Sequence, residues 1–425
     1  MGIAQRISEF RSGFSSTFWI ANTLELFERL AFYGAKAVLV TFLLEKVGLL
    51  NEAATLAGIF SALIYALPIL AGVLVDRYGF KKTLATCFVI FCVGYFLIGM
   101  AGMQFGSEIV NAIGKRTYTL IVLILTAIGG SLIKPCIVGT VAKTTTPQTK
   151  SLGYSIYYTL VNIGGAIGPI LALVVRENLG IESVLIMSSV TSFFLFLGTL
   201  MFFKEPEDLT SEESRTFKKV FGDMLLVFAN FRFITFLLIY SGFWLMFWQI
   251  FYLVPQYGIK VLDFHKFELL EAVDAICIIF LTVPMAFVVK KLKPIAAMCL
   301  GFVFASFSWI IMGAIPTTTA TIVAIAMFAL GEATQAPRFY EYVASLAPKG
   351  QIGTFMGFAF LPVAIGSFSA GVIADWLRTT YLDSNPAMMW YIVASIGFIS
   401  TLLMLLYNMF LAPKPVASTQ TILNP

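Results

Sequence analysis

Charged side chains and histidine are scarce in this sequence. Only 12% of the 425 residues are charged and one is a histidine, whereas about a quarter of the residues in an ordinary soluble domain are charged. The five cysteines are an odd number, and they lack the spacing of a disulfide framework or a zinc site. The basic residues lie between apolar runs rather than in one patch, so nucleic acid is not an expected partner. Because His265 lies in a predicted loop, an integral membrane enzyme is also not expected.

Long apolar runs take the place of the missing charge. Hydrophobic residues make up 59% of the chain, and the mean hydropathy is +0.89. A helix of about 20 apolar residues crosses the hydrocarbon core of a bilayer, which is ~30 Å thick. We therefore predict an all-α integral membrane protein with twelve transmembrane helices, at 17–44, 53–75, 83–103, 117–142, 152–175, 184–203, 233–258, 269–289, 295–314, 320–346, 353–375 and 390–411.

The polar segments divide the chain into two halves. The long polar stretch 204–232 predicts a cytoplasmic linker with room for a surface helix, between six-helix bundles at 1–203 and 233–412 and before a tail at 413–425. Basic residues are concentrated in the loops on the side of the N-terminus, which places both termini in the cytoplasm. The spacing along the sequence between Pro135 and Pro337 is the same as that between Gly164 and Gly366. This weak repeat predicts a binding site between the halves, near the bilayer midplane.

The first span contains four charged residues, although each costs at least about 3 kcal/mol at the centre of a span. They are Glu25, Glu28, Arg29 and Lys36, with Tyr33 among them. Glu25 and Arg29 are spaced i,i+4, so a purely structural ion pair is one interpretation. The other is a cavity-facing stripe that binds a charged substrate or carries a proton. The extra cation at Lys36 favours the second interpretation.

Further charged residues lie in the later spans. Lys134 has no opposite charge in its own helix, so we expect it to pair with Glu25 or Glu28, either as a structural bridge or as a switch that also binds a substrate carboxylate. Asp274 and Glu332 stand in apolar surroundings, which favour the protonated form of a carboxyl group. A zwitterion could therefore place its carboxylate against the first half and its amine against the second.

Two other groups of residues are candidates for gating or binding. Asp76 and Arg77 lie in the loop between the second and third spans, and Arg338 and Glu341 lie near the cytoplasmic end of the tenth. Both pairs could lock a gate or stabilise a helix end. Gln249 is a candidate for contact with a substrate, as one of few polar residues in an aromatic-rich seventh span.

Several motifs resemble those of a known family. Residues 72–82, GVLVDRYGFKK, resemble the signature loop of the major facilitator superfamily, and residues 25–34, ELFERLAFYG, look like the E-x-x-E-R-F-x-Y-Y-G signature of proton-dependent oligopeptide transporters. The pair Lys134-Pro135, the stretch 154–169 and Gly331-Glu332 also match that family's pattern. The resemblance extends over most of the chain.

The resemblance implies a proton-coupled symporter that imports small zwitterionic solutes, with di- and tripeptides as the expected substrates. It assigns proton coupling to Glu25, Glu28, Arg29 and Lys134, and contact with the peptide to Lys36, Tyr33, Tyr65, Asn162 and Glu332. The only coupling ion would be the proton, with no cofactor, and the protein would be a monomer in a bacterial inner membrane or an equivalent membrane.

The sequence departs from the family in the seventh and eighth spans. Trp248 occupies the place of a family glutamate, and Asp274 stands where an asparagine is usual. A carboxylate has therefore moved from one span to the next. This leaves open a transporter of another small solute, such as an amino acid, organic anion or drug, working as a symporter, facilitator or exchanger.

Overall fold

The computed structural model describes residues 13–146, 149–206, 216–348 and 351–412, and these segments contain helices and no strands. The first twelve residues, part of the predicted linker (207–215) and the predicted tail (413–425) lie outside the described residues. The all-helical fold class predicted from the sequence is confirmed for the rest of the chain.

The first half comprises ten helical segments. In chain order they are α2 (Ser16–Phe42), η1 (Leu43–Val47), α3 (Ala53–Ala66), α4 (Pro68–Tyr78), α5 (Phe80–Met100), α6 (Gln104–Ile113), α7 (Lys115–Ser131), α8 (Ile133–Lys143), α9 (Lys150–Leu179) and α10 (Ile181–Phe202). The linker then forms helix α11 (Phe217–Ala229).

The second half follows the linker helix. Its segments are α12 (Phe231–Phe247), α13 (Gln249–Tyr252), α14 (Val254–Lys260), α15 (Phe267–Val289), α16 (Pro294–Ala314), α17 (Thr318–Leu346), α18 (Ile352–Gly357), η2 (Phe358–Phe360), α19 (Leu361–Tyr381) and α20 (Pro386–Phe410).

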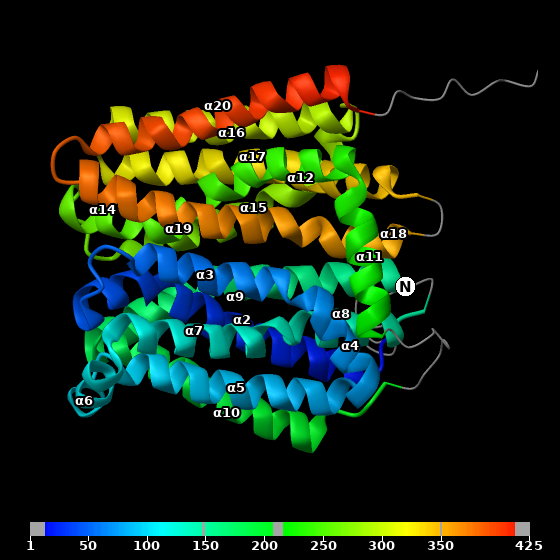
Figure 1. Cartoon of the computed structure of the whole chain (residues 1–425), viewed down its shortest axis with the longest axis horizontal. Coiled ribbons are helices and arrows are strands. Elements are labelled where there is room, and N and C mark those ends of the chain that lie inside the picture. The colour runs from blue at the N-terminus through cyan, green and yellow to red at the C-terminus, as the bar shows by residue number, and fades with distance from the viewer. Residues whose placement is uncertain (1–12, 147–148, 207–215, 349–350, 413–425) are drawn as a thin grey trace, which may run out of the picture.

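The long helices run roughly parallel or antiparallel and form two bundles that lie side by side (Figure 1). One bundle contains α2–α10, and the other contains α12–α20. They meet mainly where α3 packs against α19 and where α9 packs against α15. The chain enters and leaves the described structure at the same end of the molecule, which we call the terminal end; the other is the distal end (Figure 1).

Ten helices in the described part of the chain are long and apolar enough to cross a membrane, and the bent pair α3–α4 raises the number to eleven. The chain is thus a multi-pass integral membrane protein. Helix α2, predicted as the first span, is not among them although it has 27 residues. The reason is its four charged residues, because they exceed what a membrane-spanning segment of ordinary composition carries.

Three of the spans are broken. Pro68 begins α4 after a 48° bend, as expected for a residue that lacks a backbone N–H and is favoured at the first turn of a helix. Leu132 separates α7 from α8, and Trp248 and Leu253 separate α12, α13 and α14. Lys134 and Trp248 lie at or beside these interruptions, where Leu132 and Trp248 keep right-handed helical backbone angles.

Helix α11 is an amphipathic segment of the linker. It buries Val220 and Val227 while Phe221 and Leu225 are exposed. It contacts α4 of the first bundle and α18 of the second, across the terminal end (Figure 1). The exposed apolar face fits a helix that lies in the membrane interface.

The two bundles touch closely at the distal end. The backbone of Gly371 on α19 lies so near α3 that an added Cβ would come within 2.3 Å of the Ala54 carbonyl oxygen. The buried Asp375 carboxylate accepts hydrogen bonds from the backbone N–H groups of Ala54 (3.2 Å) and Thr55 (2.7 Å). These groups are unpaired in the first turn of any helix, so one half supplies the cap for a helix of the other.

We expect Gly371→Val to part the two bundles at the distal end, because the new side chain has no space between α19 and α3. The distance between spin labels at the exposed positions Leu50 and Ser384, in a background without the native cysteines, should lengthen. Gly222→Val is the control, since nothing lies within 4 Å of a Cβ there. An unchanged distance in Gly371→Val would contradict this prediction, because it would show that the interface accommodates the valine side chain without separation of the bundles.

Candidate functional site

The charged stripe of α2 is centred on Arg29. Its guanidinium forms ion pairs with Glu28 and, at 3.4 Å, with Glu25, and it lies over the ring of Phe32. All three charged residues are at most 3% exposed. Tyr157 of α9 donates a hydrogen bond to Glu25 at 3.5 Å. The i,i+4 ion pair predicted from the sequence is confirmed, and Arg29 binds two carboxylates at once.

Glycines of α9 make this burial possible. An added Cβ at Gly164 would lie 2.4 Å from the Cβ of Arg29, and one at Gly168 would lie 2.8 Å from the carbonyl oxygen of Leu30. Such small residues let two helix backbones approach closely in a membrane. The glycines therefore bring α9 against the charged stripe, which seals the ion pairs from lipid and water.

Lys134 is placed differently from our expectation. Its ammonium lies 4.5 Å from the ring centre of Tyr65 and 4.3 Å from that of Phe360. Glu25 and Glu28 act on it electrostatically, but it forms no ion pair with a described residue, because Arg29 takes both carboxylates. The predicted bridge to the first span is absent in this conformation, and Lys134 instead reaches a ring of the other half.

Lys36 is held by aromatic rings. Its ammonium lies 3.5 Å from the ring centre of Phe251 and 3.8 Å from that of Trp248, with Tyr33 and Phe247 at 5.3 and 5.5 Å. We call these four rings the Lys36 cage. Three of them come from the second half, at the break between α12 and α13. Cation–π contacts of this kind are worth ~2 kcal/mol or more when they are desolvated.

Three carboxylates of the second half interact electrostatically with Lys36: Glu271 and Asp274 of α15, and Glu332 of α17. Both carboxylate oxygens of Glu271, Oδ1 of Asp274 and Oε2 of Glu332 are buried without a hydrogen-bond partner. Within the described residues no group of side chains is arranged to hold a metal ion. The structure thus brings Asp274 and Glu332 towards the cations of the first half.

Glu271 is a residue that the sequence reasoning missed. It is 2% exposed and lies on the same helix as Asp274. A signal was present, because Glu268, Glu271 and Asp274 recur every third residue in an otherwise apolar segment. Such spacing places side chains on neighbouring parts of one helix face.

Two of the predicted substrate contacts have local partners. Asn162 is half-buried, and its amide donates to the Tyr158 carbonyl oxygen of its own helix at 2.9 Å. Gln249 is fully buried and donates to the carbonyl oxygens of Leu245 and Ala370, both at 3.3 Å. The Gln249 amide therefore joins α13 to α19 within the second half, while its Oε1 is buried without a hydrogen-bond partner among the described residues.

The predicted gating residues lie at the terminal end. Asp76 and Arg77 are exposed at the end of α4. The turn beside them is held by Glu205, whose carboxylate accepts hydrogen bonds from the backbone N–H groups of Phe80 and Lys81 at 2.5 and 2.9 Å. Glu205 therefore caps the N-terminus of α5, where a carboxylate is favourable.

Arg338 and Glu341 form the ion pair that their i,i+3 spacing suggests. Arg338 also donates to the Leu292 carbonyl oxygen in the turn between α15 and α16. Both partners belong to the second half, so the pair fastens helices of one bundle and does not join the two bundles in this conformation.

The distal end is closed by contacts between the halves that the sequence did not reveal. Arg176 of α9 forms an ion pair with the fully buried Glu268 of α15 and donates to the His265 carbonyl oxygen. Gln256 donates to the Thr41 hydroxyl at 3.1 Å. By contrast, Phe27, Tyr158 and Tyr340 are 39–48% exposed. The molecule is therefore closed at the distal end and more open towards the terminal end.

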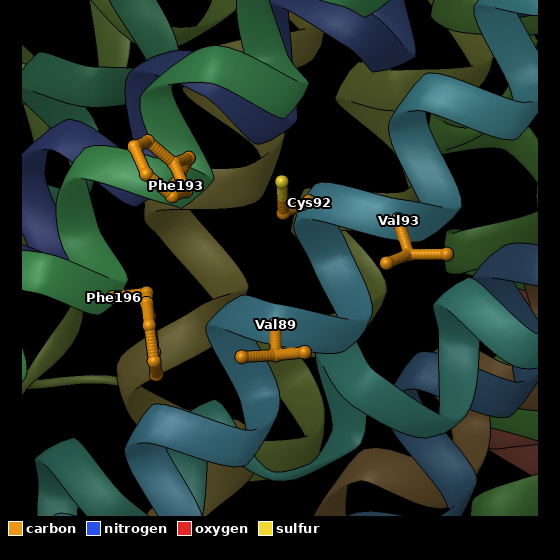
Figure 2. Close-up of a pocket in the computed structure, with 5 residues that line it drawn as sticks. All are labelled: Val89, Cys92, Val93, Phe193 and Phe196. Carbon is orange, nitrogen blue, oxygen red and sulfur yellow. The ribbon is translucent and has the colours of Figure 1, made fainter.

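An apolar pocket lies away from this charged region. Val89, Cys92 and Val93 of α5 and Phe193 and Phe196 of α10 line it (Figure 2). Val89, Val93 and Phe193 are 41–47% exposed on the outer surface. With no charged lining residue, the pocket fits a lipid-facing groove rather than a site for a polar solute.

Comparison with known proteins identifies the family. Residues 24–371 match the Major Facilitator Superfamily. The chain belongs to that superfamily. Members of the superfamily are transporters rather than enzymes, as the resemblance of the sequence motifs predicted.

Individual relatives are named as peptide permeases. The chain is similar to dipeptide and tripeptide permease B of Xenorhabdus bovienii, with 28% identity over 167 residues, which are 38% of this chain and 32% of that protein. The same-named protein of Aeromonas hydrophila is 26% identical over 225 residues, or 50% and 42% of the two chains. The match thus spans a third to two fifths of these relatives.

Solved structures share the fold over nearly the whole chain. A POT family transporter in complex with 5-aminolevulinic acid has a TM-score of 0.77 at 16% identity, covering 92% of this chain and 96% of that one. The peptide transporter POT in complex with sulfate has a TM-score of 0.75 at 18% identity, covering 92% and 94%. These likenesses establish the fold.

We expect Arg176→Gln to destabilise the protein more than Lys266→Gln. The first change strands the buried Glu268, which we expect to cost about 2–3 kcal/mol, whereas Lys266 and Glu177 form an exposed pair at 3.9 Å that is worth at most about 1 kcal/mol. Denaturant unfolding of the detergent-solubilised protein measures both. Equal losses of stability would contradict a structural role for the buried pair.

Proposed function

We propose that this protein is a proton-coupled symporter that imports small zwitterionic solutes, with di- and tripeptides as the main substrates. The observation that carries the proposal is the placement of opposite charges on the facing halves. Lys36 and Lys134 belong to the first half, and Asp274 and Glu332 belong to the second. The names of the permeases to which the chain is similar support the same substrate class.

In the proposed binding mode the solute bridges the halves. Its carboxylate lies against Lys36 and Lys134, whose ammonium groups have no ion-pair partner among the described residues, and its amine lies against Glu332 and Asp274. Tyr33, Tyr65 and Asn162 would line the same space. A zwitterion suits this arrangement because each of its charges replaces water with an opposite charge, which offsets the cost of burial.

Proton coupling follows from competition for the cations of the first half. Arg29 already forms ion pairs with Glu25 and Glu28, while Lys134 interacts electrostatically with both carboxylates without forming an ion pair with a described residue. When a proton neutralises one of these carboxylates, its attraction for Lys134 is lost, and Lys134 binds the carboxylate of the solute more strongly. When the proton leaves, the carboxylate regains its attraction for Lys134 and the solute is released.

The proposed topology has twelve spans and cytoplasmic termini. Helix α2 would supply the span missing from the eleven apolar ones, since its 27 residues extend over about 40 Å. The bundles at 1–203 and 233–412 would rock about the site, with the linker 204–232 and the gating groups Asp76, Arg77, Arg338 and Glu341 on the cytoplasmic side. The closed distal end would then face the outside, and the protein would act as a monomer without a cofactor.

A second candidate is a transporter of another small solute, such as an amino acid, organic anion or drug. The observation that favours it is Trp248, whose ring holds Lys36 at the place where the resembled family has a glutamate. This exchange removes a charge from the seventh span. A thermal-shift screen of peptides, single amino acids and organic anions distinguishes the two candidates.

We expect Glu25→Gln, Lys134→Ala and Glu332→Gln each to lower gradient-driven dipeptide uptake into proteoliposomes by at least tenfold. Each change removes one partner of the charge exchange, and a buried charged partner is worth more than about 1.4 kcal/mol. The exposed Glu108→Gln serves as the matched control and should leave uptake unchanged.

Uptake that is identical with and without an inward proton gradient would contradict the coupling. If all three variants kept gradient-driven uptake, the assignment of the charges would be wrong. Equal melting temperatures of the variants would exclude misfolding as the cause of a loss.

We expect a fluorescent protein fused after Pro425 to fluoresce and an alkaline phosphatase at the same place to be inactive, since both termini are proposed to be cytoplasmic. Fusions in the loop after Val261 should behave in the opposite way. The same result at both places would contradict the topology.

A further inference from the structure

The buried charges between the two bundles do not balance. Three neighbouring groups are set aside because each is compensated locally: Glu268 by Arg176, Glu341 by Arg338, and Asp375 by two backbone N–H groups. Within the network of described charged groups that interact electrostatically with Arg29 or Lys36, carboxylates outnumber cations by two. They are Glu25, Glu28, Glu271, Asp274 and Glu332 against Arg29, Lys36 and Lys134.

The excess of carboxylates lies in the second half. Arg29 serves both carboxylates of α2. Among the described residues, Lys36 is the one electrostatic partner of opposite sign that Glu271, Asp274 and Glu332 have. A zwitterion adds equal amounts of both charges, so it cannot remove this excess. Buried ionised carboxylates without a partner are costly, so each of them must gain either a proton or another cation when the zwitterion binds.

Glu271 is a buried carboxylate, 2% exposed, whose oxygens have no hydrogen-bond donor among the described residues. The charged groups that face it are Lys36 from α2 and Glu268 from its own helix. Glu268 is neutralised by Arg176 of α9. A donor that reached Glu271 would thus satisfy a buried carboxylate that no described side chain satisfies.

The Lys36 cage shows that this region accommodates an ammonium group. The Lys36 ammonium rests on the faces of Phe251 and Trp248 and forms no ion pair with any described residue. Aromatic faces and carboxylates are the two surroundings that stabilise organic cations in proteins. Lys36 contacts the aromatic rings, so the carboxylates of Glu271 and Asp274 are available to bind a second cation.

We propose that the site prefers solutes with one positive charge beyond the zwitterion, namely short peptides with a lysine- or arginine-type side chain, and that Glu271 and Asp274 bind this added cation. The inference rests on the proposed function and narrows its substrate class. The backbone amine of the peptide keeps Glu332, the backbone carboxylate keeps Lys36 and Lys134, and the basic side chain extends along α15 towards the distal end.

The test compares ligands that differ only in this charge. Binding of Ala-Lys, Ala-Ala and Ala-Lys with an acetylated side chain is measured by calorimetry on the full-length purified protein. Acetylation keeps the length of the side chain and removes its charge. Ala-Lys should bind about tenfold or more tightly than either neutral peptide, because a charged hydrogen-bonded contact is worth ~1.5–3 kcal/mol.

Variants then test whether Glu271 is responsible for the preference for a basic side chain. Glu271→Gln should bring the ratio of Ala-Lys to Ala-Ala affinity close to one, while the exposed Glu108→Gln should leave the ratio as in the unaltered protein. Asp274→Asn should lower the ratio partly. A retained tenfold ratio in Glu271→Gln would overturn the role of Glu271.

Other outcomes separate this inference from the proposed function. If all three peptides bound equally to the unaltered protein, the preference would be overturned, and extra protons carried with each neutral peptide would identify protons as the compensating charge. If no peptide bound, the proposed function itself would fall together with the inference. The comparison in the unaltered protein needs no variant, so misfolding of Glu271→Gln would not obscure it.

Discussion

The structure depends on burying an arginine with two carboxylates on one helix, α2. Removing Arg29 from this group would leave two carboxylates without their cation in a medium of low polarity, which costs several kcal/mol. The group therefore dictates its surroundings. Gly164 and Gly168 must be small so that α9 can seal it, and α2 must lie inside the bundle rather than against lipid. Lys134, left without a carboxylate, turns to the rings of Tyr65 and Phe360.

The same principle describes the charged part of the interface between the two halves, which lies within a hydrophobic core that both halves share. The first half presents ammonium groups to the interface, and the second presents carboxylates, yet Lys36 and Lys134 rest on aromatic rings rather than in salt bridges. Rings hold a cation without directional hydrogen bonds. An ammonium can leave such a surface at moderate cost, whereas leaving a buried salt bridge strands a charge. In the described conformation, cation–π contacts rather than salt bridges hold these two lysines at the interface.

The sequence predicted features that lie within one helix and missed those that join different helices. The span predicted at 83–103 corresponds to Phe80–Met100, and the Glu25–Arg29 pair follows from its i,i+4 spacing. The partner of Lys134 was predicted wrongly for this conformation, because pairing between helices depends on rotations and breaks that hydropathy does not encode. The bridge between Arg176 and Glu268 was missed for the same reason, since each residue alone resembles an ordinary charge at a helix end.

The cap that Asp375 provides for α3 gives the distal end an unusual character. Breaking most contacts of a closed gate costs free energy. Here the backbone N–H groups of Ala54 and Thr55 and the Asp375 carboxylate can each form hydrogen bonds with water in place of those with one another. The net change is therefore small in either direction. If the two halves part at the distal end as proposed, these two hydrogen bonds would therefore contribute little to the free-energy difference between the closed and open conformations, and a bound solute or proton would need to supply only a modest bias against them.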